Sequence, residues 1–289
     1  MIEKGKTIMK FNKQLSLKIS IRSVMHLVLI IGAFIMVAPF LYMIIGSFKY
    51  AQDIISLKFQ LFSPRWTLYN WQYMFDLVPV LRGYLNSLII SISGTAIVIF
   101  TSTVGGFLLS KFRFKGRNAL FYFILSTMMI PIYTSIIPLY YLIAKMHISS
   151  NYIGVIIPYI ASAFSIFLMR QFISGIPDEL IEAARIDGAS DYRIFFTIIM
   201  PLAKSAIGIV GILTFLSIFN DFLWPLIAIS KTEMATLPVV LARVSGQQEG
   251  SLYGANLAAS SVAVIPILIV YAFFQKFIVK GITTTGMKV

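Results

Sequence analysis

SGIPDELIEAARIDGASDYRIFFTIIMPLA, residues 174–203, is the stretch that decides how this chain is organised. It lies between two apolar stretches, 151–173 and 204–230, and holds five of the eleven acidic residues of the 289-residue chain. Elsewhere charge is scarce, because 58% of all residues are hydrophobic and only 12% are charged. A soluble domain carries about 25% charged residues. Lipid rather than water therefore solvates most side chains.

Six stretches of the chain are apolar over the roughly 20 residues that a helix needs to cross the hydrocarbon core of a bilayer. Their limits are 24–48, 85–110, 118–144, 151–173, 204–230 and 252–279. The sequence therefore predicts an all-α integral membrane protein with six transmembrane helices. Each of the last four stretches contains proline, which membrane helices accept where neighbours or cavity water satisfy the freed carbonyls. We expect kinked helices around a cavity.

The basic residues predict the orientation of these helices. The chain has 24 Lys and Arg against 11 Asp and Glu, a net charge of +13. Seventeen of the 24 fall on one side of the predicted spans, which the positive-inside rule makes cytoplasmic. Both termini then lie in the cytoplasm. The expected parts are a basic N-terminal segment 1–23, a six-span domain 24–279 and a cytoplasmic tail 280–289. Because topology explains the positive charge, the bilayer is an expected partner and nucleic acid is not.

Within the segment 174–203 the residues predict a helix, a sharp turn and a second helix at the membrane surface. Pro177 followed by two acids is typical of a helix start, where proline is tolerated and negative charge is favoured. Gly188 ends that helix because glycine adopts positive φ at no steric cost. Ser190 is then placed to cap the second helix.

The same segment carries a family resemblance. Glu182-Ala183-Ala184, then Gly188, then the run Ile198 to Pro201, resemble the EAA loop of permease subunits of bacterial ATP-binding cassette importers. The longer form P-x-E-L-x-E-A-A-R-I-D-G-A-S is similar to the carbohydrate-uptake branch, which includes the maltose-type and multiple-sugar permeases. Other similar segments are Asn86-Ser87, SKFRFKGRN at 110–118, IPLYYL at 137–142, FLMRQF at 167–172, FNDFLWPL at 219–226 and FFQKFIVKGI at 273–282.

The resemblance implies a function and a set of partners. It implies a permease in the bacterial plasma membrane that moves a carbohydrate, by preference an oligosaccharide, into the cytoplasm by alternating access. The implied partners are a second homologous permease subunit, two cytoplasmic ATPase subunits and an extracytoplasmic sugar-binding protein. In that family the EAA loop docks in a cleft of the ATPase. The residues that this assigns to ATPase coupling are Glu182, Ala183, Ala184 and Gly188, with Arg185 and Asp187 as supporting polar contacts.

No catalytic, cofactor or metal site is expected on this chain. Its only G-K-[ST] is Gly5-Lys6-Thr7, which lacks the earlier glycine of a phosphate-binding loop. ATP with Mg²⁺ is therefore expected in the partner subunits. His26 and His147 have no second ligand at metal spacing.

Few polar residues lie inside the predicted spans. Asp221, beside Asn220 and ahead of Trp224, is the clearest acid in an apolar stretch, and burial of a charge in lipid is costly. It either serves the translocation pathway or has a structural role, in which it pairs with a helix end that Pro225 frees or with the partner subunit. Ser87 and Ser91 in the second span either face the pathway or pack helices together. Asn220, Asp221, Trp224, Ser87 and Ser91 are the five candidates for a solute pathway.

Two functions of other classes stay open at this point. An autonomous ion-coupled transporter would usually carry ionisable residues in several spans and an internal repeat. Here only Asp221 stands out, and no repeat is visible. An integral-membrane enzyme would need clustered carboxylates or histidines, or a phosphate site. The acids of 174–203 form the one cluster, and helix capping accounts for them.

Overall fold

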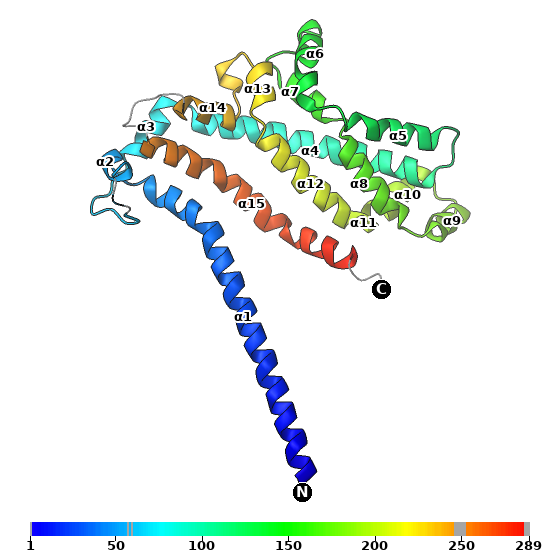
Figure 1. Cartoon of the computed structure of the whole chain (residues 1–289). Coiled ribbons are helices and arrows are strands. Elements are labelled where there is room, and N and C mark those ends of the chain that lie inside the picture. Colours follow the sequence, from blue (N-terminus) through cyan, green and yellow to red (C-terminus); the bar gives the residue numbers. More distant parts are fainter. Residues whose placement is uncertain (1, 57, 59, 246–252, 286–289) are drawn as a thin grey trace. The chain divides into compact units, whose positions relative to one another are not determined.

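Helices and connecting loops make up the whole described part of the chain, which is residues 2–56, 58, 60–245 and 253–285 of a computed structural model (Figure 1). No strand occurs in those ranges, as the sequence predicts. The helices are α1 (Ile2–Gly46), α2 (Ala51–Ile54), α3 (Tyr69–Leu77), α4 (Val80–Lys111), α5 (Arg117–Thr127), α6 (Ile132–Lys145), α7 (Tyr152–Ile156), η1 (Ile157–Tyr159), α8 (Ala163–Ser174), α9 (Asp178–Ile186), α10 (Asp191–Ile194), the π-helical η2 (Phe195–Ile199), α11 (Met200–Leu202), α12 (Lys204–Phe219), α13 (Leu223–Ala228), η3 (Thr232–Met234), α14 (Leu237–Ser245) and α15 (Tyr253–Thr285).

Among the described residues, three helices are long and apolar enough to cross a membrane, or up to six if each bent pair of helices is one span. The three continuous spans are Arg22–Gly46 in α1, Val80–Lys111 in α4 and Tyr253–Phe273 in α15. They correspond to the first, second and sixth apolar stretches of the sequence. Residues 286–289 of the expected tail 280–289 lie outside the described part.

The chain divides into two compact units, and the first comprises Met1–Met74 with Gln248–Ser261. Asn70 organises its described part, because the buried amide of this side chain donates to the carbonyls of Ser47 and Lys49 at 2.8 and 2.7 Å. Lys49 is itself buried and donates to the carbonyl of Gln60. These bonds tie the segment after α1 to α3.

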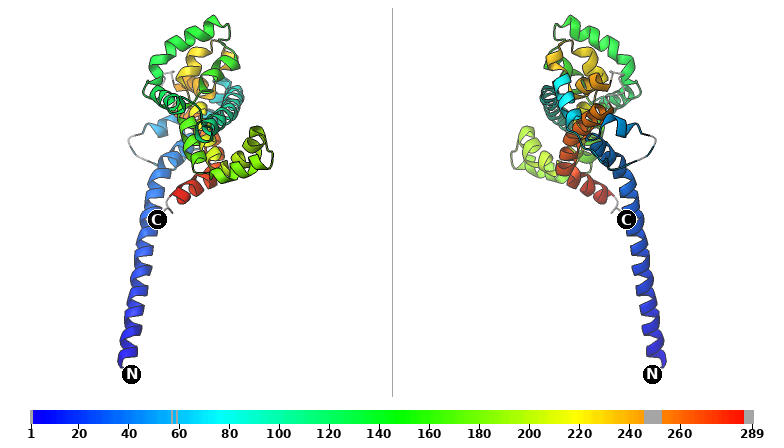
Figure 2. Two further views of the ribbon diagram at one scale, coloured as in Figure 1. Left: turned by 90° about the vertical axis from the view of Figure 1, so that its right-hand side faces the viewer. Right: turned by 90° about the vertical axis from the view of Figure 1, so that its left-hand side faces the viewer.

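The second unit comprises Phe75–Gln247 with Val262–Val289, and α4, α8 and α12 pack together at its centre (Figures 1 and 2). Gly106 on α4 allows the closest approach. A Cβ at that position would lie 2.8 Å from the backbone nitrogen of Arg170 and from Cβ of Met169 on α8. Fully buried Val98, Ile173 and their neighbours continue the core along this contact.

Breaks replace the kinks that the sequence predicts in the third and fourth apolar stretches. The third is two helices, α5 and α6, bent by 98°, and the fourth is Tyr152–Tyr159 followed by α8 at 49°. Pro131 precedes the first residue of α6, and proline is accommodated there because the amide of that position has no helical partner. Inside one continuous helix, Pro131 would leave the carbonyl four residues before it without a hydrogen-bond donor.

The predicted fifth span, 204–230, is wrong at its end. Helix α12 stops at Phe219, and the short α13 follows only after Asn220–Phe222. Pro225 is the reason, because its ring would clash with the carbonyl of residue 221 in a continuous helix and it has no amide to donate. A bent pair does include α12, but its other member lies before α12 in the chain. It is the segment Asp191–Leu202, made of α10, η2 and α11, which meets α12 at 77°.

The contact at Gly106 leads to a test with a matched control. We expect Gly106→Ala to force α4 and α8 apart and to lower the free energy of unfolding by about 1–3 kcal/mol, the usual effect of overpacking. Gly105→Ala is the control, because its Cβ would meet Ile166 at an ordinary 3.5 Å. Thermal unfolding of the detergent-solubilised protein measures both. Equal melting temperatures for the two variants would contradict the close packing.

Candidate functional site

Helices α9 and α10 form a small hairpin beside the end of α4 that carries Lys111 (Figures 1 and 2). Pro177 precedes α9, whose first turn is acidic, so negative charge meets the positive end of the helix dipole. Gly188 has φ of 77° and turns the chain after α9. The Ser190 hydroxyl then accepts from the amide of Arg193 at 3.4 Å and caps α10. The order of helix, turn and helix agrees with the sequence.

One face of α9 is buried against other helices of the second unit. Ile181 is 3% exposed and lies in the same apolar cluster as Ile173 and Ile194. Ala184, three residues on, packs against that cluster as well. Glu182 and Ala183 are exposed. The two alanines therefore have different surroundings, and only Ala183 lies on the exposed face.

Lys111 fastens the start of α9 to the end of α4. Its side chain is only 4% exposed, and its Nζ donates to the carbonyl of Ile176 and to Asp178 Oδ1, each at 2.5 Å. The hydrogen bond and charge of Lys111 hold the pKa of Asp178 below its ordinary value. Since a lowered pKa means that the contact favours the ionised carboxylate, the ion pair is present at neutral pH and is lost as the pH falls through the pKa of Asp178, while the bond of Lys111 to the carbonyl of Ile176 remains.

Arg185 links α9 to its neighbours on the surface. Its guanidinium donates to Asp191 Oδ1 at 2.9 Å and lies 5.6 Å from the ring centre of Phe112. Both partners of the ion pair are about half exposed, so the pair contributes little stability by itself. Asp187 has a backbone role, because its amide donates to the carbonyl of Ala183 and closes α9.

The sequence analysis missed two large apolar side chains at the tip of this hairpin. Ile186 is 86% exposed and Tyr192 is 81% exposed. A helical wheel would have found the first, because Ile186 is four residues after Glu182 and shares its face. The exposed face of the hairpin thus combines an acid, a small residue and two apolar side chains.

A separate cavity of about 700 Å³ lies in the second unit, where α12 ends. The cavity is lined by residues of α6, η1, α12, α13 and the segment between α12 and α13. They are Ile132, Tyr133, Ile136, Leu139, Pro158, Tyr159, Ser217, Asn220, Asp221, Phe222, Leu223 and Trp224. Three of the five candidates for a solute pathway are therefore together in one place.

Asp221 is the polar centre of this cavity. The hydroxyl of Tyr159 donates to its Oδ2 at 2.7 Å, and the amide of Trp224 donates to its Oδ1 at 3.3 Å. The second bond satisfies an amide at the start of α13, which is the structural pairing that the sequence left open. Trp224 is 5% exposed and its indole donates to the carbonyl of Val155 at 3.0 Å. Asn220 is exposed.

Ser87 and Ser91 lie elsewhere, buried on α4. The Ser87 hydroxyl accepts from the amide of Leu237 at 2.8 Å, and Ser91 donates to the carbonyl of Ser87. The neighbouring Asn86 donates to the carbonyls of Glu233 and Ala235, both at 2.9 Å. This part of α4 holds the chain before α14, and neither serine lines the cavity.

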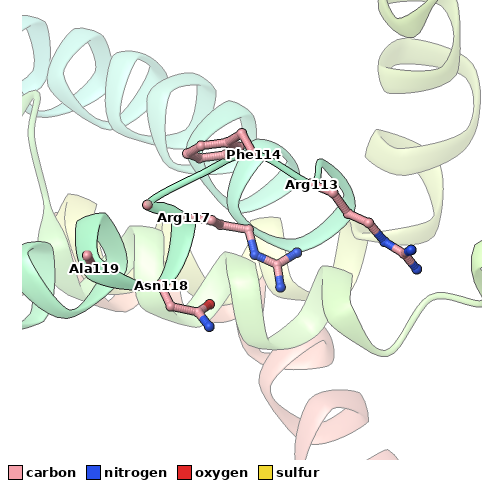
Figure 3. A pocket seen from close by; sticks show the side chains of 6 residues that line it. Arg113, Phe114, Arg117, Asn118 and Ala119 are labelled. Atoms are coloured by element: carbon pink, nitrogen blue, oxygen red, sulfur yellow. The ribbon is translucent and has the colours of Figure 1, made fainter.

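The basic turn between α4 and α5 encloses a smaller hollow of about 290 Å³ (Figure 3). The guanidinium of Arg117 donates back to the carbonyl of Phe112 at 3.2 Å. Figure 3 shows Arg113 and Arg117 among the side chains that line the hollow. Gly116 has φ of 86° and makes the turn tight. Arg117 thus has a structural use in addition to its charge.

Comparison with known proteins gives the family context. Residues 99–284 match the family described as "Binding-protein-dependent transport system inner membrane component". The chain is 34% identical over 253 residues to the arabinooligosaccharides transport system permease protein AraQ of Bacillus subtilis, with 86% of this chain and 90% of that protein covered. It is 30% identical over 264 residues to the diacetylchitobiose uptake system permease protein NgcG of Streptomyces coelicolor, with 90% and 87% covered.

A solved structure has the same fold. It is the crystal structure of a bacterial ABC transporter involved in the import of the acidic polysaccharide alginate, one chain of which matches with a TM-score of 0.78. The sequence identity is 24%, and the match covers 88% of this chain and 94% of that one.

Removal of the Lys111 tie tests how firmly α9 is held. We expect Lys111→Met to leave the carbonyl of Ile176 without its buried donor and to ease local opening of α9 by about 1–3 kcal/mol. Hydrogen exchange of the α9 amides measures this. Asp178→Asn has a smaller effect because Asp178 is 64% exposed. Lys115→Met, at an exposed position of the same turn, is the control. Unchanged α9 exchange in Lys111→Met would argue against the tie.

Proposed function

The chain belongs to the family of binding-protein-dependent transport system inner membrane components, and from this premise we propose how it moves its solute. It is a multi-pass permease subunit of a sugar importer in the inner membrane. The two relatives above are, by name, permeases for arabinooligosaccharides and for diacetylchitobiose. On this ground an oligosaccharide is the proposed solute, and alternating access carries it into the cytoplasm.

The proposed complex contains three kinds of protein partner. A second homologous permease subunit completes the passage, two cytoplasmic ATPase subunits supply energy, and an extracytoplasmic sugar-binding protein delivers the solute. ATP and Mg²⁺ are bound by the ATPase subunits, and this chain binds no cofactor. The bilayer surrounds the apolar helices, such as Arg22–Gly46 of α1, whose side chains are largely exposed in the isolated chain.

The exposed face of α9 and α10 is the proposed ATPase-docking surface, with Glu182, Ala183, Ile186 and Tyr192 as its contact residues. Its mixture of apolar tips and an acid is typical of an interface, where a few large side chains supply most of the binding energy. Gly188 and Asp187 shape the turn. Arg185 supports the surface through its ion pair with Asp191, and Ala184 supports it by packing against the apolar cluster beneath α9.

The packing supplies a mechanical route from this surface to the cavity. Ile181 and Lys111 join α9 to α8 and α4. Helix α8 begins at Ala163, after the break that follows the cavity residue Tyr159, and α12 ends at Phe219, directly before the cavity residues Asn220 and Asp221. A push on α9 and α10 therefore moves α8 and α12, which begin and end next to residues of the cavity, and this is how a rigid-body switch transmits motion.

The proposed orientation places α9, α10 and both termini in the cytoplasm. The support is the basic excess of the segment 1–23, of the turn 111–117 and of the C-terminal end. In this proposal the basic segment 1–23 lies in the cytoplasm. The six-span permease domain is 24–279, and the tail 280–289 is cytoplasmic as well.

The proposed solute pathway passes the cavity, where Asn220, Asp221 and Trp224 gather. Non-helical backbone within a membrane is tolerated where it lines a cavity, and the segment 220–222 between α12 and α13 lines this one. Ser87 and Ser91 act on the pathway only indirectly, through the packing of α4.

The identity of the solute is tested by sugar retention and uptake. We expect the purified binding protein of the complex to retain arabinotriose or diacetylchitobiose, and the reconstituted importer to take it up only with ATP. Arabinose and N-acetylglucosamine are the single-unit controls. Retention of single units alone, or of no carbohydrate, would overturn the oligosaccharide assignment.

The docking surface is tested by Glu182→Lys and Gly188→Pro. We expect both proteins to insert in the membrane but to lose uptake, because the first reverses a charge on the surface and the second cannot adopt φ of 77°. Matched controls are Glu233→Lys, at an exposed position away from the hairpin, and Gly175→Ala, where φ is −79°. Uptake and membrane level are measured together. Wild-type uptake by either docking variant would refute its assignment.

A further inference from the structure

The charge of the side chains that line the cavity bears on which sugars can bind there. Among the described residues that line it, Asp221 has the one charged side chain, and none is Lys, Arg or His. We infer that this cavity is the chain's own half of a sugar site, which accepts neutral saccharides and disfavours anionic ones, with Asp221 as the specificity residue. The inference rests on the proposed function and names the substrate class of that site.

The cavity has the composition of a site for a small neutral polar ligand. Its volume of about 700 Å³ lies within the ordinary range of ligand pockets, roughly 300–1,000 Å³. Its walls are mainly apolar and aromatic, with Tyr133 exposed at 71%. The polar groups gather at one place, where the exposed amide of Asn220 lies next to Asp221. Apolar walls with a few convergent polar groups are what a saccharide needs, since its rings combine C–H faces with hydroxyl groups.

Asp221 is held so that it can still accept from a ligand. A carboxylate has about four acceptor sites, and Tyr159 and Trp224 each occupy one. The two donors also fix the orientation of the carboxylate. A sugar hydroxyl can donate to the remaining lone pairs, whereas the carboxylate group of a uronate or a fully ionised phosphate group has no proton to donate and meets a like charge. At 4 Å that repulsion weakens binding roughly fivefold in water-like surroundings, and by more where water is excluded.

The absence of cysteine from the sequence allows a direct measurement of this charge. Ser217 lines the cavity, is exposed, and lies one helical turn before Asp221. In the complete importer, Ser217→Cys places a thiol there that a cationic or an anionic methanethiosulfonate reagent modifies. We expect the cationic reagent to react faster. Addition of Asp221→Asn should lower the ratio of cationic to anionic rates roughly fivefold or more.

Two further variants test whether the ratio of reaction rates depends on charge inside the cavity. Glu233→Gln removes an exposed carboxylate outside the cavity and should leave the ratio unchanged. Asn220→Asp adds a carboxylate to the cavity and should raise the ratio, which gives a result of opposite sign if Asp221→Asn fails to assemble. A ratio that neither cavity variant changes, or a Ser217→Cys thiol that neither reagent reaches, would overturn the inference.

Protection by sugars tests the selectivity itself. We expect arabinotriose to slow modification of Ser217→Cys at least twofold and trigalacturonate to have no effect. In the background of Asp221→Asn, trigalacturonate should protect as well. Equal protection by the two sugars at wild-type Asp221, or protection by neither, would overturn the inference. ATP-dependent uptake of any oligosaccharide by the wild-type importer is measured separately, so failure of the selectivity is distinguished from failure of the proposed function.

Discussion

The need to pair backbone groups away from water is the constraint on which this structure depends. Hydrocarbon offers no hydrogen-bond partner, so a helix can break inside a membrane only where protein or cavity water takes over. Pro131 and Pro225 force two such breaks, and Pro158 lies beside a third. All three breaks border the same cavity. Asp221 accepts from the freed amide of Trp224, so the residue that repairs the backbone is also the charge of the cavity.

The second unit connects this cavity to the α9–α10 hairpin by means of a few close contacts. Gly106 lets α4 meet α8 at backbone distance, and the core around Ile173 continues to Ile181 on α9. Lys111 closes the same connection from the α4 side. Interiors packed in this way move as rigid pieces, because they have little free volume to absorb a displacement. A rigid connection is what the proposed coupling to ATPase subunits requires.

Single residues show how far sequence reasoning reached. Gly188 and Ser190 were correctly placed at the turn and the cap, since such residues act through local backbone geometry. Asp221 was singled out because an acid in an apolar stretch needs a partner, but Tyr159, 62 residues away in the chain, was not found. To predict that Ala184 is partly buried and Ile186 exposed, a helical wheel would have been needed, since exposure depends on which face of α9 is buried.

The sequence by itself determined the all-helical membrane class, the number of apolar stretches and the local form of the hairpin, because hydropathy, proline and capping act over a few residues. Only the tertiary structure decided which residues meet around Asp221, and that Ser87 and Ser91 are buried. Those outcomes depend on contacts between residues far apart in the chain, such as Ser87 with Leu237. No local pattern encodes such contacts, because they form only when α4, α8 and α12 are packed together.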